Sequence, residues 1–250
     1  MPTNAPHSDP AADLPAYVGI LLAGGAGARY RASAGDDGAD KLLALLPDGR
    51  PIVVAAAMAL REVATRVLVV LRPGRSALRD ALARVPGCEL IESVEAERGM
   101  GASLAAAARH LCAQDAPGDG AGGVSARGMG TVSAGGVVAV PAHGVVAVSA
   151  RGVAAVPARG VLVALGDMPW VTPATLQAIC QAGAGHPIVA PEYDGRRGHP
   201  VAFAWDLLPE LARLDGDTGA RVLLQRHGVH LLPCHDAGVL RDVDTIADLA

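Results

Sequence analysis

Aromatic residues are scarce in this chain of 250 residues, which has one Phe, two Trp and three Tyr. Single-stranded nucleic acids bind by stacking their bases on aromatic rings, so this scarcity argues against such a partner. The net charge of −4 argues against a general polyanion binder, because that function needs a basic surface. We therefore expect no nucleic-acid partner, and a core built from Ala, Val, Leu and Ile.

The sequence also lacks closely spaced cysteines, a basic N-terminal segment and long apolar runs. Four cysteines are spread along the chain: Cys88, Cys112, Cys180 and Cys234. Their spacing excludes a CxxC redox pair or a zinc knuckle, and sparse thiols are typical of a reducing compartment. The first Lys or Arg is Arg29 and no apolar run reaches about 18 residues, so we expect neither a signal peptide nor a transmembrane helix. These features predict a cytoplasmic protein without a membrane partner.

An octapeptide is repeated five times over residues 120–159, each copy beginning with Gly and carrying Val at its fifth position. The unit has no ladder of polar residues and is poorly suited to a β-solenoid, so we interpret the repeat as a low-complexity, partly disordered insertion. Residues 1–15 are rich in Pro, Ala and Asp and predict a disordered N-terminal tail. Residues 16–250 are expected to form one domain that the insertion interrupts.

Strand-like and helix-like segments alternate outside the insertion. Apolar runs predict strands at 17–22, 66–71, 89–91, 160–165, 187–190, 201–203 and 229–233. Helices are predicted at 53–63, 76–85, 103–114, 173–182, 207–214, 220–227 and 245–249. This alternation predicts an α/β fold, a three-layer α/β/α sandwich around a mostly parallel sheet. Ligands of such folds bind at the carboxyl ends of the strands, where we expect the functional residues.

The first predicted strand ends in a glycine-rich turn, LAGGAGAR, which runs from Leu22 to Arg29. Glycines let backbone N–H groups approach a phosphate chain closely, and Arg29 and Lys41 supply cations for its oxygens. The spacing matches neither the P-loop nor the Rossmann dinucleotide fingerprint. A tight turn with a helix cap is the alternative interpretation.

Acidic residues follow the central strand and precede the last predicted helix. Asp167, in the motif GDMP after strand 160–165, is well placed to hold a divalent cation, although it could instead form a turn or cap a helix. Asp242 or Asp244 is a candidate for a second metal ligand, while Asp244 or Thr245 could cap the final helix.

Three further motifs are candidates for substrate contacts. Ser103 is expected to cap the helix 103–114, whose first N–H groups would be free for an anion or a base. His199 follows two arginines and Gly198, and it is either a structural turn residue or a contact for an anionic substrate. Residues 215–221 predict a loop and a helix cap, with Arg221 as a candidate phosphate contact.

Seven motifs, taken in this order, resemble the MobA-like NTP transferase family, and within it the MocA branch of molybdenum cofactor cytidylyltransferases. The motifs are LAGGAGAR, DKLL, GMGASL, GDMPW, GHPV, GDTGAR and DVDT, and the resemblance covers residues 17–114 and 160–250. It implies a Rossmann-like sandwich of the nucleotide-diphospho-sugar transferase type, so that 16–250 would be a nucleotidyltransferase domain. It also implies transfer of CMP from CTP, or of GMP from GTP, to the phosphate of molybdopterin, with Mg²⁺ as cofactor and release of pyrophosphate.

The resemblance also implies roles for individual residues. The nucleotide would contact Leu22, Ala23, Gly24, Gly25, Gly27, Arg29, Lys41 and Ser103, the last of these toward the acceptor side. The catalytic residues would be Arg29, Lys41 and Asp167, with Mg²⁺ on Asp167 and on Asp242 or Asp244. The acceptor would lie near Arg197, Gly198 and His199.

Two departures from the family pattern bear on these roles. Gly24 stands where the cytidylyl branch usually has Ala, which is a guanylyl feature, whereas GMGASL, GDMPW and GHPV favour CTP. The segment 30–39 lacks the usual Met-Gly and is expected to be a long acidic loop.

Three alternatives stay open at this point: a guanylyltransferase, a transferase acting on a sugar phosphate or another phosphorylated metabolite, and a non-catalytic cofactor chaperone for a molybdoenzyme. Retention of the two cations and of Asp167 argues against the chaperone. A molybdoenzyme or its chaperone is a further expected partner.

Overall fold

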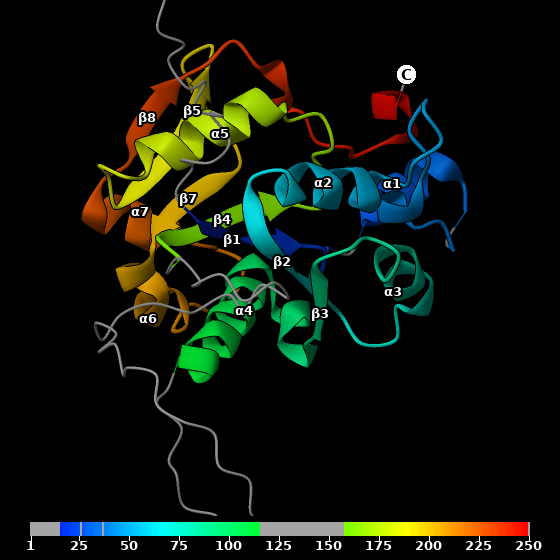
Figure 1. The fold of residues 1–250 in the computed structure, drawn as a ribbon. Helices are drawn as coiled ribbons and strands as arrows, with labels where there is room; N and C mark the ends of the chain where they lie inside the picture. The colour runs from blue at the N-terminus through cyan, green and yellow to red at the C-terminus, as the bar shows by residue number, and fades with distance from the viewer. Residues whose placement is uncertain (1–15, 26, 37, 116–157, 250) are drawn as a thin grey trace, which may run out of the picture.

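A computed structural model describes residues 16–25, 27–36, 38–115 and 158–249, which form an eight-stranded sheet between layers of helices (Figure 1). The strands are β1 (Tyr17–Leu22), β2 (Ala64–Leu71), β3 (Cys88–Glu92), β4 (Gly160–Leu165), β5 (Ile188–Tyr193), β6 (Arg196–Arg197), β7 (Val201–Ala204) and β8 (His230–Pro233). Their order across the sheet is β3-β2-β1-β4-β7-β5-β6, with β8 beside β5. The predicted strands at 17–22 and 160–165 coincide with β1 and β4.

Four adjacent strands, β3, β2, β1 and β4, run in the same direction. β1 pairs in parallel with β2 and β4, and β2 pairs in parallel with β3. β7 is antiparallel to both β4 and β5, while β8 is parallel to β5. The carboxyl ends of β3, β2, β1 and β4 therefore lie along one edge of the sheet, which is where the sequence places most candidate residues.

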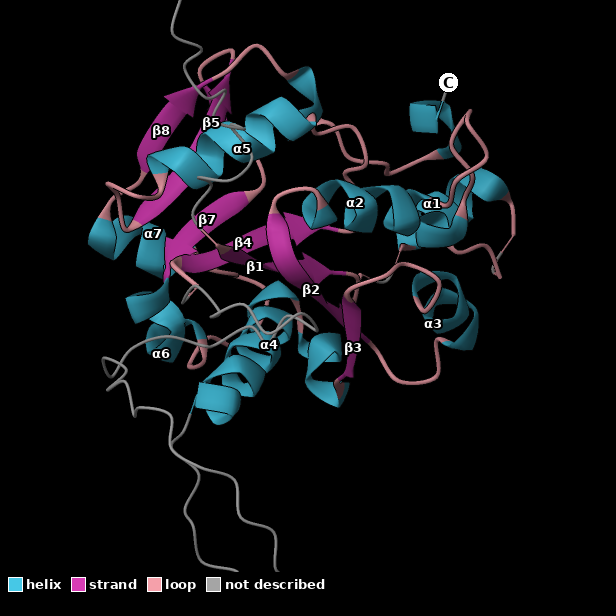
Figure 2. Ribbon diagram, in the orientation of Figure 1, coloured by secondary structure: helices cyan, strands magenta, loops and turns pink. Residues whose placement is uncertain are grey.

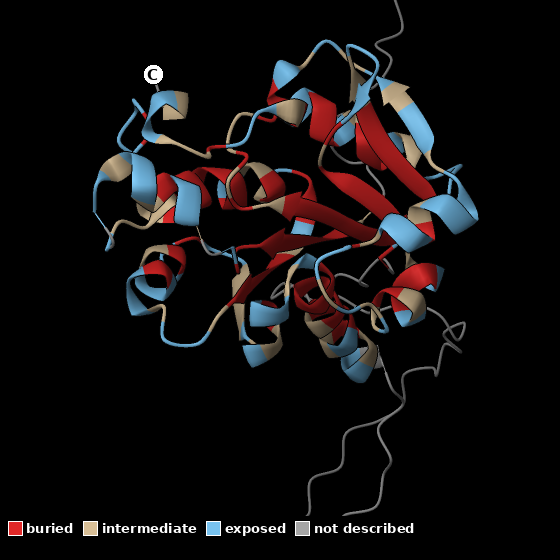
Figure 3. Ribbon diagram, turned by 180° about the vertical axis from the view of Figure 1, so that it is seen from behind, coloured by how far each residue is buried: buried red, intermediate tan, exposed pale blue. Residues whose placement is uncertain are grey.

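Helices cover both faces of this sheet, as Figure 2 shows, and the predicted three-layer α/β/α fold is confirmed. The main helices are α1 (Ala28–Ala34), α2 (Ile52–Arg61), α3 (Ser76–Leu82), α4 (Met100–Asp115), α5 (Pro173–Ala182), α6 (Leu208–Leu211) and α7 (Arg221–His227). Alternate residues of β1 point to opposite faces. Leu21 packs in one core cluster with residues of α2 and α5, whereas Ile20 and Leu22 pack in another with residues of α4 and α6. β1 and β4 are consequently buried on both faces along almost their whole length (Figure 3), whereas β3, β6 and β8 are partly or fully exposed.

For three predicted helices and one predicted loop, the structure differs from the prediction. Residues 28–34, within the segment expected to begin a loop, form α1, which is framed by Gly27 and Gly35 in the left-handed region. The helix predicted at 207–214 divides into a 3₁₀ turn and the short α6. The last predicted helix is a 3₁₀ turn, Ile246–Leu249. The helix predicted from Ser103 begins earlier, at Met100.

The predicted tail at 1–15 and residues 120–157 of the predicted insertion lie outside the described residues. The last two residues of the repeat are described, and they belong to the edge of the domain. The Arg159 N–H donates to the Ala16 carbonyl at 2.7 Å, and its carbonyl accepts from the Trp205 N–H at 2.9 Å. The folded domain thus resumes before residue 160. Within its described part, no helix is both long and apolar enough to span a membrane.

Candidate active site

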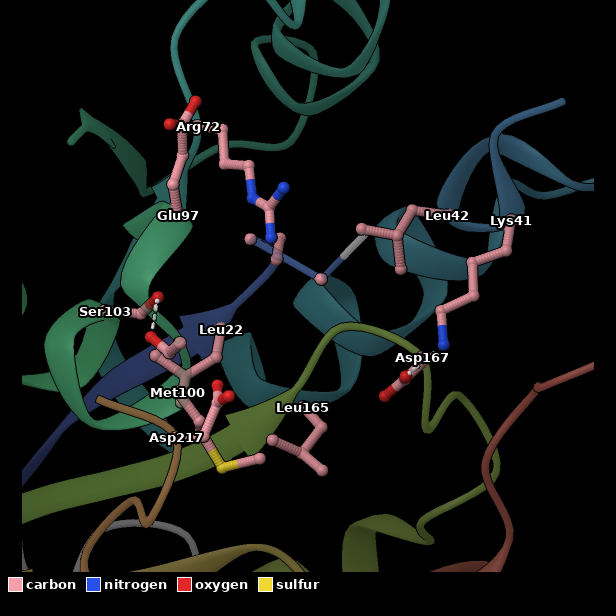
Figure 4. Close-up of a pocket in the computed structure, with 14 residues that line it drawn as sticks. Leu22, Lys41, Leu42, Arg72, Glu97, Met100, Ser103, Leu165, Asp167 and Asp217 are labelled. Atoms are coloured by element: carbon pink, nitrogen blue, oxygen red, sulfur yellow. Dashed lines mark hydrogen bonds and ion pairs between the residues drawn. The ribbon is translucent and has the colours of Figure 1, made fainter. Parts of the chain in front are cut away.

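A cleft of about 410 Å³ opens at the carboxyl ends of β1, β2 and β4 (Figure 4). Its lining residues are Leu22, Ala23, Gly24, Gly25, Lys41, Leu42, Arg72, Glu97, Gly99, Met100, Ser103, Leu165, Asp167 and Asp217. They come from segments that are far apart in the sequence, and the parallel strands bring them to one edge of the sheet. The glycine turn, Lys41, Ser103 and Asp167 are therefore brought together as the sequence led us to expect.

The glycine turn continues β1 and then lies against the start of α4. The Ala23 N–H donates to the Val70 carbonyl at 3.0 Å, which holds the turn in register with β2. A Cβ atom at Gly24 would lie 3.2 Å from the Ala96 Cβ and 3.3 Å from the Ser103 Oγ. A larger residue there would require these neighbours to move by a few tenths of an ångström, so packing favours a glycine at position 24.

Lys41 and Asp167 form an ion pair at one end of the cleft. The Lys41 Nζ donates to the Asp167 Oδ2 at 2.6 Å and to the Val243 carbonyl at 3.1 Å. The two side chains are only 10% and 21% exposed, so the charges interact across little water. Lys41 opens a 3₁₀ turn whose first N–H groups are capped by Asp40, which accepts from the Leu42 N–H.

Two more carboxylates from the C-terminal segment lie near the Lys41–Asp167 pair, outside the cleft lining. The Val243 N–H donates to the Asp167 carbonyl at 3.0 Å, which places Asp242 and Asp244 beside Asp167. Partial desolvation, and then the negative charges of Asp244 and Asp167, raise the pKa of the Asp242 carboxyl. The Asp244 carboxylate pairs with Arg29, whose side chain is 79% exposed, and lies 3.7 Å from the Lys41 Nζ. Arg29 therefore lies outside the cleft lining and contacts the site through Asp244.

This donor set fits a divalent cation only in part. Among the residues that the structure describes, no three His, Cys, Asp or Glu side chains are grouped to hold a metal ion. Mg²⁺ in phosphate-transfer sites is usually held by one or two carboxylates together with phosphate oxygens. Asp167 and its carboxylate neighbours can supply that smaller protein share, provided that the substrate supplies the remaining oxygens.

The start of α4 differs from the predicted anion site. The Gly216 carbonyl accepts from the Gly101 N–H at 2.8 Å and from the Ala102 N–H at 3.4 Å. These donors are therefore not free for an anion. Ser103 lies inside the first turn and is not the helix cap, because its hydroxyl donates to the Gly99 carbonyl at 3.0 Å. It nevertheless lines the cleft, with 3% of its surface exposed.

The loop that occupies the start of α4 also places Asp217 in the cleft. A Cβ atom at Gly99, whose φ is +122°, would overlap the Asp217 carboxylate, so only glycine permits this approach. The sequence identified residues 215–221 as a loop but did not assign Asp217 to the site. Arg221, the candidate phosphate contact in that motif, begins α7 and is not among the lining residues.

The predicted acceptor residues do not line this cleft. Arg197 is exposed on β6, and Gly198 is buried where a Cβ atom would lie 2.4 Å from the Val239 carbonyl oxygen. His199 borders a separate, largely apolar cavity of about 10 Å³. Burial, followed by the positive charge of Arg197, lowers the pKa of His199, while the nearby charge of Asp167 opposes that shift. These three residues thus lie outside the cleft lining, although His199 and Asp167 are close enough to interact electrostatically and the cavity beside His199 shares Leu165 with the cleft.

Comparison with known families identifies the chain. The model of the MobA-like NTP transferase domain matches residues 19–118 and 135–231. The chain belongs to this family. It is thus a nucleotidyltransferase of the MobA-like type, which binds a nucleoside triphosphate, and the family expected from the motifs is confirmed.

Solved structures agree with this assignment for the MobA-like transferase. Rv0371c from Mycobacterium tuberculosis H37Rv is 27% identical over 93% of this chain and 95% of its own, with a TM-score of 0.60. The same protein in complex with manganese is 26% identical over 94% and 96%, with a TM-score of 0.59. Molybdopterin-guanine dinucleotide biosynthesis protein A from Archaeoglobus fulgidus is 19% identical over 93% and 94%, with a TM-score of 0.56, and shares the fold. A comparison with curated proteins finds no matching sequence.

The structure of this MobA-like transferase adds two charged residues that sequence reasoning missed. Arg72 directly follows β2, and Glu97 lies in the 3₁₀ turn Val94–Arg98 after β3. In the view of Figure 4, both residues lie toward the end of the cleft away from Lys41 and Asp167, and the Arg72 guanidinium points into the cleft. The signal for Arg72 was the same as that for Asp167, a charged residue just beyond a buried parallel strand.

Proposed function

We propose that this MobA-like transferase is a molybdenum cofactor cytidylyltransferase, which transfers CMP from CTP to the terminal phosphate of molybdopterin and releases pyrophosphate. The observation that carries the proposal is the cleft itself, in which a glycine turn lies next to the buried Lys41–Asp167 pair. A phosphate nucleophile is already ionised at pH 7, so the reaction needs positioning and charge stabilisation and no strong general base.

In this proposal the cleft holds the nucleotide along the carboxyl edge of the sheet. The nucleoside lies against the turn from Leu22 to Gly27 and beside Ser103. Lys41 and Arg29 neutralise the triphosphate, where Lys41 exchanges its Asp167 partner for a phosphate oxygen. Asp244, which contacts both cations, positions them.

The bond changes in the proposed step are balanced. A terminal phosphate oxygen of molybdopterin attacks the α-phosphorus of CTP. The bond between the α-phosphorus and the oxygen that bridges to the β-phosphate breaks, and its electron pair leaves with pyrophosphate. Charge develops on that bridging oxygen, on the side of the cleft where Lys41 lies.

A divalent cation, proposed to be Mg²⁺, belongs to the same end of the cleft. Asp167 and Asp242 are the carboxylates proposed to hold it, because Asp244 is engaged by Arg29. When bound, such a cation supplies Lewis-acid neutralisation of the phosphate oxygens. Partial desolvation, and then the charges of Asp244 and Asp167, raise the pKa of Asp242, and this grouping of carboxylates supports a cation at this position. The manganese complex of the mycobacterial relative also supports a divalent cation.

The choice of CTP over GTP rests on three sequence motifs that resemble the cytidylyl branch of the family, namely GMGASL, GDMPW and GHPV. Gly24 is weaker evidence for GTP, because its close contacts with Ala96 and Ser103 favour a glycine irrespective of the base.

The name of the archaeal neighbour supports molybdopterin as the acceptor. Contacts of that acceptor with Arg197, Gly198 and His199 stay a prediction. A molybdoenzyme or its chaperone as a partner, and a cytoplasmic location, likewise belong to this proposal.

The decisive experiment measures pyrophosphate release by the full chain with molybdopterin and either CTP or GTP, in Mg²⁺ and in Mn²⁺. We expect release with CTP and molybdopterin, and at most slow release with GTP. Faster release with GTP would make the protein a guanylyltransferase. Release with a sugar phosphate but not with molybdopterin would overturn the acceptor. No release with any acceptor would favour the cofactor chaperone.

A further inference from the structure

Three charged side chains of the cleft have no part in the phosphate chemistry proposed above: Asp217, which packs against Gly99 at the start of α4, and Arg72 and Glu97. The Arg72 Nε is buried and has no hydrogen-bond partner. Within the described part of the chain, neither Arg72 nor Glu97 forms an ion pair, although both line the cleft. A buried donor without a partner costs free energy, so the arrangement around Arg72 is expected to be completed by a ligand.

The sheet order separates this pair from the phosphate end. Glu97 follows β3, Arg72 follows β2, the glycine turn follows β1, and Asp167 follows β4. Neighbouring strands lie about 4.8 Å apart, so the ends of β2 and β4 are roughly 10 Å apart, on opposite sides of the glycine turn. Figure 4 shows Arg72 and Glu97 toward the end of the cleft away from the Lys41–Asp167 pair. If that pair marks the phosphate end, Arg72 and Glu97 are on the side that the proposed function assigns to the nucleoside.

The two side chains offer complementary hydrogen bonds. A guanidinium can only donate, and an ionised carboxylate can only accept. Such a pair matches a base edge that carries both a carbonyl oxygen and an exocyclic amine. Cytosine and guanine have both groups, whereas adenine has no carbonyl oxygen and uracil has no exocyclic amine.

We propose that Arg72 and Glu97 read the nucleobase and restrict this protein to bases that carry both an oxo and an amino group. Arg72 donates to the carbonyl oxygen, and Glu97 accepts from the exocyclic amine. This inference rests on the proposed function only in placing a nucleoside triphosphate in the cleft. It adds the reason why ATP and UTP are excluded, and it does not depend on the acceptor.

The test measures equilibrium binding of CTP, GTP, UTP and ATP by titration calorimetry, with Mg²⁺ and without acceptor. The full chain is compared with R72M, E97Q and R79M. Methionine keeps much of the arginine length but has no donor. Arg79 is the matched control, because it is a half-exposed arginine on α3 that pairs with Glu92 outside the cleft.

We expect the unmodified protein to bind CTP or GTP at least about 10-fold more tightly than ATP and UTP. R72M should weaken binding of that preferred nucleotide by about 10- to 100-fold and leave ATP binding within about threefold, because a hydrogen bond to a charged group is lost. E97Q should reduce the preference over UTP by about 10-fold, because the amide can donate to the uracil O4. R79M should change none of these affinities.

If R72M weakened the binding of all four nucleotides equally, the proposal would be overturned, because Arg72 would then contact the phosphates and not the base. Unchanged affinities in R72M, or no base preference in the unmodified protein, would overturn it as well. Thermal unfolding of R72M and R79M shows whether either variant is simply misfolded, and E97Q provides an independent readout at an exposed side chain. Selective CTP binding without pyrophosphate release would refute the proposed function and leave this inference standing.

Discussion

Replacement of Asp167 by Asn separates a catalytic role of this carboxylate from a structural one. The amide has nearly the same shape as the carboxylate and retains an oxygen that can accept from Lys41. It loses the negative charge, and with it the ability to hold a divalent cation and to balance the lysine. We therefore expect D167N to fold and to fail in catalysis.

The expected loss of stability is small. The Lys41–Asp167 hydrogen bond of 2.6 Å joins side chains that are 10% and 21% exposed, and a charge-assisted bond of this kind contributes about 1.5–3 kcal/mol. Lys41 keeps its bond to the Val243 carbonyl at 3.1 Å. Removal of one negative charge also relieves the repulsion that raises the pKa of Asp242. The free energy of unfolding should therefore fall by about 2 kcal/mol or less.

The expected loss of activity is large, because a cation that stabilises charge on the phosphates contributes several kcal/mol to the transition state. Pyrophosphate release should fall by at least about 10³-fold. Binding of Mn²⁺ in the presence of CTP, followed by electron paramagnetic resonance, should weaken in parallel. The matched control is D80N, at an exposed position of α3.

Denaturant unfolding and pyrophosphate release are measured on both variants. Turnover of D167N within about threefold of the unmodified protein would refute the metal role of Asp167. Loss of folding in D167N would refute the structural reasoning about Lys41.

Two further predictions concern the insertion and acid stability. Deletion of residues 120–157 should leave pyrophosphate release within about twofold, because all the motifs assigned to the site lie outside this segment of the sequence. Extending the deletion through Arg159 should lower the melting temperature by removing its bonds to Ala16 and Trp205. An inactive but folded 120–157 deletion would contradict this prediction. Asp236 is partly desolvated, which raises its pKa, but donors from Thr172, Thr175 and Gly238 outweigh that effect and lower the pKa overall. Its contribution to stability is therefore present above about pH 4 and is lost as the pH falls through the folded-state value. D236N should be less stable at pH 7 by about 1–2 kcal/mol and lose less stability between pH 5 and 3, and an acid titration with the same slope in both proteins would disprove the assignment.

Some elements of the fold could be predicted because their signal is local. The apolar runs of β1 and β4 are buried on both faces. Because polar residues do not alternate with apolar ones in these runs, they are readily assigned as buried parallel strands. Asp167 could be placed in the site for a related reason. Residues that directly follow a parallel strand lie at the carboxyl edge of the sheet, where ligands bind. That rule applied equally to Arg72, which it would have identified if extended to cations.

Other elements depend on distant contacts. α1 has seven residues, which is too short to be stable alone, and it forms because Tyr30 packs in a cluster with Ile52 and Val243. The early start of α4 depends on the Gly216 carbonyl, more than a hundred residues away. Neither contact leaves a local pattern in the sequence.

The amino-acid sequence by itself determined the alternation of strands and helices, the close-packing glycine turn and the types of charged group available for phosphate chemistry. These depend on hydrophobic period and on backbone freedom, which are properties of short segments. The tertiary structure decided which charges meet. The order β3-β2-β1-β4 places Arg72 and Asp167 on opposite sides of the turn, and the contact between Val243 and Asp167 brings the C-terminal carboxylates to Lys41. Arg197 and His199 lie outside the cleft lining. Strand order and such long-range hydrogen bonds arise from pairing between segments, so no single segment can specify them.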